Sequence, residues 1–479
     1  MSNVRDFGVS GDGRTDESAA LEHALHDGDG TLEFPPGTYR LSRTLHVDLA
    51  RHGRFALSGQ GGTAKLLMTG PGPAISLLAQ HGGSADPKTF TPAEWDRERM
   101  PTISQIEIVG GHPEADGIRI EGVMQPTLAG VLIREVRTGV HITKRARNVV
   151  ISHCHIYNNK GIGVHLDKVN LHQAIITGSH ISYCRLGGIR IEGSEIRNLQ
   201  ITGNDIEYNN NAAHKVPGAD GEPTAEIYID SREGTVREGT ISSNTIQATY
   251  SPGGSNVRFI GHPGPPLKAS EQAPASGDYA HKTGMFTISG NLIGSQETNI
   301  HLTSARGITI TGNVIYSAFR RNLLVEGCRN IVVGSNAFEH NPDYKELELC
   351  TGIRFADSVD CMLTGVLIQD ARAGQPTVKQ AIPIEREGVV ELIRCRRMNL
   401  SGCQVVEPTP VGIYLEDCAN TLITGCTVLD ARQPPLMRAA IRWKGTGTGS
   451  QIGVCRLGRG TAGTLMLEPN VPVVNVLEG

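Results

Sequence analysis

A six-residue phrase of alternating apolar and polar residues recurs along most of the chain. Where nothing interrupts it, successive copies lie about 22–25 residues apart, which is a spacing typical of solenoid repeats. Copies of this phrase include "ISHCHI" (151–156), "ITGSHI" (176–181), "ITGNDI" (201–206), "ISGNLI" (288–293), "ITGNVI" (310–315) and "ITGCTV" (423–428). A second phrase follows each copy after a turn, as in "GVHLDK" (163–168), "GGIRIEG" (187–193), "EIYIDS" (226–231) and "GIYLED" (412–417). The chain is therefore one structural unit repeated many times.

Both phrases have the period of a β-strand with one buried face. Asn and Gly stand between the phrases and suit tight corners, because both tolerate positive φ. Strand and turn alternate without a helical period, which predicts an all-β fold, a parallel β-solenoid of roughly 10–13 coils. The alternative, a leucine-rich horseshoe, needs an L-x-x-L-x-L-x-x-N frame that the sequence lacks.

Composition agrees with small, regular layers rather than one large globular core. The 479 residues include 58 glycines, and aromatic residues make up only 4%. The net charge of −4 argues against nucleic acid as a partner, because nucleic-acid binding needs a basic face. No apolar run reaches the length of a membrane span, so we expect no membrane association.

Two features bear on the cellular compartment. The first residues, "MSNVRDFGVSGDG" (1–13), lack the charged-then-apolar pattern of a signal peptide. The ten cysteines show no C-x-x-C spacing and fall mostly inside apolar strand patterns, so we expect reduced, buried thiols. A reducing compartment is favoured, and a secreted protein whose leader has been removed stays open as the alternative.

The one clear helical pattern lies near the amino terminus, in "DESAALEHALH" (16–26), where apolar residues recur at helical spacing. A solenoid must cover its first coil, because an open end exposes strand edges and core. We therefore interpret residues 1–45, including "TLEFPPGTYRLS" (31–42), as an N-terminal cap with a capping helix. Residues 46–479 then form the solenoid, and the chain is predicted to be a single domain.

The opening "VRDFGVSGDGRTDESAALEHAL…GTLEFPPGTYRLS" (4–42) resembles the start of the pectate-lyase-like superfamily of right-handed parallel β-helix proteins. That superfamily includes polysaccharide hydrolases, polysaccharide lyases and phage tailspikes. The resemblance implies a right-handed parallel β-helix and a carbohydrate substrate. The repeat by itself indicates neither the hand of the helix nor its ligand.

Insertions interrupt the regular spacing near residues 80–100, 208–224, 250–284, 339–350 and 370–388. Insertions in solenoids tend to gather on one face, which is often the binding face. The two longest leave the chain at the same corner of consecutive coils, so we expect them to form one wall of a cleft. Tolerance of surface loops to growth is the alternative interpretation.

Alignment of the second phrases places two columns of side chains on the outward face of the strands. The first column reads Arg119, His141, His165, Arg190, Tyr228, His301, Leu324, Arg354, Tyr414 and Arg442. The second column reads Glu121, Thr143, Asp167, Glu192, Asp230, Thr303, Glu326, Ala356, Glu416 and Lys444. The residues between them, such as Ile189 and Ile191, are expected to face the core.

Asp167, Glu192 and Asp230 take three successive steps of the second column, with coils about 4.8 Å apart. Like charges at this spacing repel, so we expect a raised pKa for at least one of these acids. Glycosidic hydrolysis uses such a pair, one protonated acid and one ionised carboxylate. Acids on neighbouring coils suit the retaining mechanism and acids two coils apart the inverting one, and the sequence leaves both open. We predict that these acids, with His165 and Arg190, are catalytic.

Five further residues are candidates for substrate binding because they lie beside the acids or near the insertions. They are Arg119, His141, Tyr228, Tyr208 and His301. The histidines can also carry protons near neutral pH. Since aromatic residues are scarce, we expect recognition mainly by hydrogen bonds and charge.

Three functions remain open. The first is cleavage of a poly- or oligosaccharide by hydrolysis or glycosyl transfer with paired carboxylates. The second is a polysaccharide lyase or C5-epimerase acting on a uronate-containing glycan, in which His165 or Arg190 takes the C5 proton. The third is a non-catalytic fibre that binds a glycan. We expect no cofactor, although the three acids offer the oxygen ligands that calcium prefers. The resemblance is also compatible with a homotrimer.

Overall fold

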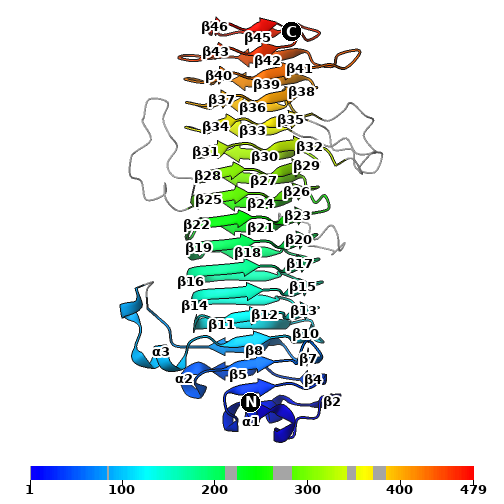
Figure 1. Ribbon diagram of the computed structural model, residues 1–479, viewed down its shortest axis with the longest axis vertical. Coiled ribbons are helices and arrows are strands. Elements are labelled where there is room, and N and C mark those ends of the chain that lie inside the picture. The colour runs from blue at the N-terminus through cyan, green and yellow to red at the C-terminus, as the bar shows by residue number, and fades with distance from the viewer. Residues whose placement is uncertain are drawn as a thin grey trace. The chain divides into compact units, whose positions relative to one another are not determined.

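The computed structural model describes residues 2–83, 86–210, 224–262, 283–341, 352–370 and 385–478. The chain divides into two compact units, Met1–Thr240 and Ile241–Gly479. Each unit is a stack of coils whose short strands pair in parallel with strands of the next coil (Figure 1). The predicted all-β parallel solenoid is therefore confirmed, and the single domain stays a prediction.

The coils of the first unit carry strands on three faces. The first face contains β5 (Leu45–Asp48), β8 (Gly72–Leu78), β11 (Ala115–Met124), β14 (Val140–Ser152), β16 (Val164–Thr177), β18 (Ile189–Glu192) and β21 (Ala225–Asp230). The second face contains β3 (Thr31–Glu33), β6 (Ala56–Ser58), β9 (Thr102–Ser104), β12 (Thr127–Ala129), β19 (Glu195–Thr202) and the ends of β14 and β16. The third face includes β10 (Glu107–Gly110), β13 (Leu132–Arg134), β15 (His155–Tyr157), β17 (His180–Ser182) and β20 (Asp205–Glu207).

Aliphatic side chains that point inward hold the coils together. Ile142, Leu166, Ile191 and Ile229 pair in register on successive strands and are at most 1% exposed. Burial of each such side chain contributes about 1.5–3 kcal/mol relative to exposure. The alternation seen in the sequence therefore separates a continuous core from an outward polar face.

The turns between phrases use Gly and Asn in different ways. Gly203 has φ 65°, a left-handed conformation that glycine adopts without a steric penalty. Asn204 instead uses its side chain, which donates a hydrogen bond to the Ile176 carbonyl (2.9 Å) and accepts one from the Ser179 amide (3.1 Å). The expectation that Asn serves these turns through positive φ is wrong at this position, because its amide satisfies buried backbone groups of the preceding coil.

The predicted N-terminal helix is present as α1 (Ser18–Asp27), and it buries Leu21, Ala24 and Leu25. It contacts β3 and β5, and Figure 1 shows it at the amino-terminal end of the first unit. Its role as a cap stays a prediction. The insertion at 80–100 contains α3 (Pro92–Arg97). The other four insertions fall largely outside the described residues, so the predicted cleft wall stays a prediction.

The second unit repeats the same plan. Its first face contains β24 (Ser255–Ile260), β27 (Thr298–Thr303), β30 (Arg321–Glu326), β33 (Ile353–Ala356), β36 (Val390–Ile393), β39 (Val411–Glu416), β42 (Ala439–Lys444) and β45 (Leu465–Leu467). Within their span, the predicted columns omitted two strands of this face. One is β24, whose Arg258 pairs with His301. The other is β36, whose Glu391 pairs with Arg354 on one side and Tyr414 on the other. The expected step from Arg354 directly to Tyr414 is therefore wrong, because the insertion before β36 hides one coil.

Two further expectations concern composition. The nine cysteines within the described residues are buried and form no disulfide, as expected for reduced thiols. Within the described ranges, no helix is long and apolar enough to cross a membrane.

Candidate functional site

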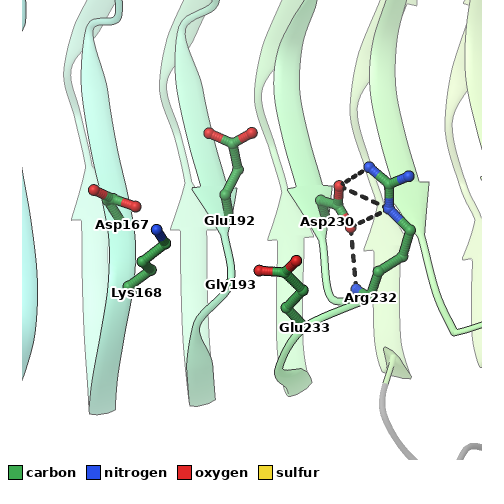
Figure 2. A pocket seen from close by; sticks show the side chains of 7 residues that line it. All are labelled: Asp167, Lys168, Glu192, Gly193, Asp230, Arg232 and Glu233. Atoms are coloured by element: carbon green, nitrogen blue, oxygen red, sulfur yellow. Dashed lines mark hydrogen bonds and ion pairs between the residues drawn. The ribbon is translucent and has the colours of Figure 1, made fainter.

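Both predicted columns are aligned on five strands of the first face, which are β11, β14, β16, β18 and β21. In the first column, the paired residues are Arg119, His141, His165, Arg190 and Tyr228, in that order. In the second column, they are Glu121, Thr143, Asp167, Glu192 and Asp230. Figure 2 shows Asp167, Glu192 and Asp230 on successive strands. The predicted register of these five coils is confirmed.

The second column opens onto a hollow of about 530 Å³. Its lining residues, drawn in Figure 2, are Asp167, Lys168, Glu192, Gly193, Asp230, Arg232 and Glu233. Gly193 has φ 54°, and a Cβ at this position would lie 3.2 Å from Lys168 Cγ. Apart from Gly193, every lining residue is charged, and acidic and basic side chains are interleaved.

Glu192 lies between two donors that come from different coils. Arg190 Nη2 donates to one carboxylate oxygen (2.8 Å), and His165 Nε2 lies 3.2 Å from the other. Burial alone would raise the pKa of Glu192, but the hydrogen bonds from His165 and Arg190 lower this pKa to about 2. Glu192 is therefore ionised at neutral pH, and the expectation of a raised pKa is wrong for this acid.

Asp230 is held by the turn that follows β21. Arg232 Nε donates to both carboxylate oxygens at 3.0 and 3.1 Å, Nη2 donates to one of them at 2.5 Å, and the Arg232 amide adds a fourth hydrogen bond at 3.0 Å. The Tyr228 hydroxyl lies 3.5 Å from Asp230. Asp230 and Tyr228 are only 8% and 9% exposed, whereas the sequence predicted open, outward side chains. The Arg190 guanidinium covers Tyr228, with its central carbon 4.7 Å from the centroid of the ring.

His141, His165 and Asp167 form a third group beside the hollow. The two imidazole rings stack with centroids 5.4 Å apart, and His141 Nε2 lies 3.4 Å from Asp167 Oδ2. One ligand atom from each of the three residues lies within 4.8 Å of the others. Burial and the neighbouring His165 lower the pKa of His141, so its neutral form is favoured near pH 7.

The three acids of the second column do not fit a calcium ion. Calcium takes six to eight oxygen ligands. Arginines already occupy the carboxylates of Glu192 and Asp230, so two ion pairs would have to break to free those oxygens. No step is therefore assigned to calcium.

Three predicted binding residues contact partners that do not line the hollow. Tyr208 follows β20 and stacks on Tyr183, with ring centroids 5.4 Å apart, and it does not line the hollow. His301 belongs to the second unit, where its Nε2 lies 2.7 Å from Glu326. Arg119 donates to Glu121 at 2.9 Å, three coils before Glu192 in the same register.

Sequence reasoning missed three residues that line the hollow, Lys168, Arg232 and Glu233. Arg232 and Glu233 follow the end of β21, and Lys168 lies within β16 but outside the two aligned columns, so the strand alignment passed over all three. Within the described parts of the chain, no hydrogen bond or ion pair engages the Glu233 carboxylate. The only signal was the charge density of the turn "DSREGT" (230–235).

Carboxyl groups with a raised pKa do occur, at Glu226 on β21, where burial is the largest cause, and at Glu207 on the third face. Burial, together with the charge and hydrogen bond of Asp205, raises the pKa of Glu207 to about 6. His180 Nδ1 lies 3.1 Å from Asp205. Repulsion between neighbouring acids, which the sequence predicted along the second column, therefore contributes to a raised pKa within one strand, β20.

Comparisons with known sequences match both parts of the chain. The family described as "Right handed beta helix region" matches residues 94–226. The family described as "Periplasmic copper-binding protein (NosD)" matches residues 268–442. The uncharacterized protein YclG of Bacillus subtilis (strain 168) is 24% identical over 404 residues, which cover 77% of this chain and 67% of the relative.

Solved structures of two phage proteins are similar to this chain. Tailspike protein 3 of bacteriophage CBA120 aligns with a TM-score of 0.54 at 13% identity, over 96% of this chain and 63% of that protein. Pre-mature gene product 12 of bacteriophage phi29 aligns with a TM-score of 0.53 at 14% identity, over 97% of this chain and 58% of that protein. The chain spans less than two thirds of both phage proteins. At these identities the likeness shows the fold alone.

Proposed function

Because the chain is a right-handed parallel β-helix protein, as the resemblance of its first residues implied, we propose that it is a carbohydrate-active enzyme. It cleaves glycosidic bonds of a poly- or oligosaccharide in the hollow beside Glu192. The observation that carries this proposal is the unequal treatment of two carboxyls in one hollow. Arg190 donates a hydrogen bond to Glu192 and His165 Nε2 lies 3.2 Å from it, whereas no hydrogen bond or ion pair engages Glu233 among the described residues.

Hydrolysis uses two carboxyl groups in different roles, one as a proton donor and one as a carboxylate. Glu233 gives its proton to the leaving oxygen as the bond between that oxygen and the anomeric carbon breaks. Glu192 acts as the carboxylate, either taking a proton from the attacking water or bonding to the anomeric carbon before water releases the sugar. In the first route Glu192 holds the proton of the water, and exchange with solvent removes it and reprotonates Glu233. In the second route Glu233 takes that proton itself, and each route consumes one water.

The remaining lining residues bind and position the glycan. Asp167 and Lys168 stand one coil before Glu192, where a carboxylate and an ammonium can hydrogen-bond sugar hydroxyls. Asp230 keeps Arg232 at the opposite wall through four hydrogen bonds. Among the described residues, no tryptophan or tyrosine lines the hollow, which supports recognition by hydrogen bonds and charge.

The first column favours a second candidate, elimination or C5 epimerisation of a uronate-containing glycan. A neutral His165 can take the C5 proton, and Arg190 can neutralise the substrate carboxylate. Both stand in adjacent steps of one column. A glycan-binding fibre without turnover is the third function, and the predicted homotrimer stays a prediction.

The proposal is tested by incubating the purified protein with a panel of neutral and acidic glycans. New reducing ends without ultraviolet absorbance are expected under hydrolysis. Absorbance from an unsaturated product would identify elimination instead, and a changed sugar configuration without chain cleavage would identify epimerisation. Binding of a glycan with no chemical change would contradict the proposed enzymatic activity and would favour the glycan-binding fibre.

A further inference from the structure

Two histidines and one aspartate on neighbouring coils bring three metal-ligand atoms together, and this grouping is separate from the roles that the proposed hydrolysis gives to His165 and Asp167. His141 lies on β14, and His165 and Asp167 lie on β16. We propose that these three side chains bind a divalent transition-metal ion, for which zinc is the probe. The inference goes beyond glycan cleavage, because metal binding is measured with no glycan present.

The spacing of the ligand atoms is close to that of a metal site. Zinc binds imidazole nitrogen and carboxylate oxygen at about 2.0–2.2 Å, so ligands of a tetrahedral site lie roughly 3.3 Å from one another. His141 Nε2 and Asp167 Oδ2 are already 3.4 Å apart. All three ligand atoms lie within 4.8 Å of one another, so side-chain rotation can bring them together. The strand register holds their backbones in place and needs no change.

The donor set selects the kind of metal. Imidazole nitrogens suit zinc, copper, nickel and iron, whereas calcium and magnesium prefer sets of oxygen atoms only. Two nitrogens and one oxygen therefore favour a transition metal. The side chains of His141, His165 and Asp167 are 27%, 17% and 32% exposed, which leaves the ion open to a solvent ligand in the fourth position.

Metal binding also has a structural consequence for Glu192. His165 Nε2 lies 3.2 Å from Glu192 Oε2, so ligation through that nitrogen replaces this hydrogen bond. Arg190 still holds the other carboxylate oxygen at 2.8 Å. The acid therefore keeps one charged partner and is free to turn toward the ion.

The experiment titrates zinc into the metal-stripped full chain with a competing chromophoric chelator. One zinc per chain is expected at this site, and the unfolding temperature should rise with zinc concentration. Separate His141→Gln, His165→Gln and Asp167→Asn substitutions should each weaken zinc binding by more than about 100-fold, beyond the usual effect of losing an outer-shell partner. Circular dichroism and thermal unfolding without zinc confirm that each variant folds.

The third face supplies a matched control. His155 and His180 also stack across neighbouring coils, with centroids 5.2 Å apart, and His180 also lies near an aspartate, Asp205. The double variant His155→Gln/His180→Gln should bind zinc as the unmodified chain does. The inference is overturned if the chain binds no zinc, if the three single variants bind it unchanged, or if the control variant alone loses it.

Discussion

His165 Nε2 lies 3.2 Å from Glu192 Oε2, although 27 positions separate the two residues along the chain. The contact exists because each coil brings its outward residues beside those of the next, so neighbours in space come from different repeats. Arg190 completes the pairing from within the same strand as Glu192. The charge state of this carboxylate is therefore a property of stacked coils, and no single repeat contains it.

Glu233→Gln tests the proton donor. The amide cannot protonate the leaving oxygen, so turnover of a natural glycan should fall by about 10²–10⁴-fold. Aryl glycosides with good leaving groups need less protonation and should be affected less. Kinetic comparison of the two substrate types measures the difference. Glu195→Gln, an exposed acid on β19, is the control and should keep full activity.

Arg232→Met tests the contact that holds Asp230. The substitution leaves a nearly buried carboxylate without its charged partner, and we expect the free energy of unfolding to fall by about 1–3 kcal/mol. Urea unfolding measures this change. The double variant Arg232→Met/Asp230→Asn removes the charge as well and should recover part of the loss. A single variant as stable as the unmodified protein would show that solvent screens this pair.

His81 gives the first unit a sensitivity to acid. The residue is 2% exposed, and its ring packs on Phe90 with the two ring centroids 4.5 Å apart. Neither ring nitrogen has a hydrogen-bond partner among the described residues. Burial, with the nearby Arg145, lowers the pKa of His81 to about 4. The unfolded chain takes up this proton near pH 6.5 and the folded chain only near pH 4. Stability should therefore fall by on the order of 3 kcal/mol as pH drops through that interval.

His81→Phe removes this titration and keeps the packing on Phe90. The unfolding free energies of the variant and the unmodified protein should converge or cross in favour of the variant as pH falls from 6.5 to 4. Urea unfolding at several pH values checks this. A constant difference between the two proteins across the interval contradicts the assignment.

The pH dependence of stability that Glu207 contributes should have the opposite sign to that of His81. Burial and the charge of Asp205 raise its pKa from 4.5 to about 6, so the folded chain holds this proton at a higher pH than the unfolded chain. Its contribution to stability is present at low pH and is lost as pH rises through about 4.5 to 6. Glu207→Gln should therefore gain stability relative to the unmodified protein over that window. Thermal unfolding at pH 4.5 and pH 7 measures the gain, and equal differences at both values would refute it.

The sequence was sufficient to predict the solenoid and the register of the site. Period-two alternation assigns each residue to the core or to the outward face, and a regular coil then stacks equivalent positions. His165 therefore stands beside Arg190, and Asp167 beside Glu192, as predicted. The same reasoning failed at β36, because an insertion concealed the coil that carries Glu391.

Side-chain partners and turn residues lay beyond that reasoning. Register does not reveal that His165 turns toward the acid column, or that Arg232 folds back onto Asp230. Both contacts depend on rotamers, and they decide which acids are ionised. Glu233 was missed for a related reason, since turns have no fixed period that would align it with the strands.

The most direct test of the central claim compares the Glu192→Gln variant with the unmodified protein. The rate at which each releases reducing ends is measured on the glycan that the panel identifies. Glutamine keeps the shape of the side chain and removes the charge held between His165 and Arg190. We predict that turnover falls by about 10²–10⁴-fold while the fold and the unfolding temperature are preserved. Full activity in this folded variant would contradict the account and place the chemistry elsewhere on the molecule.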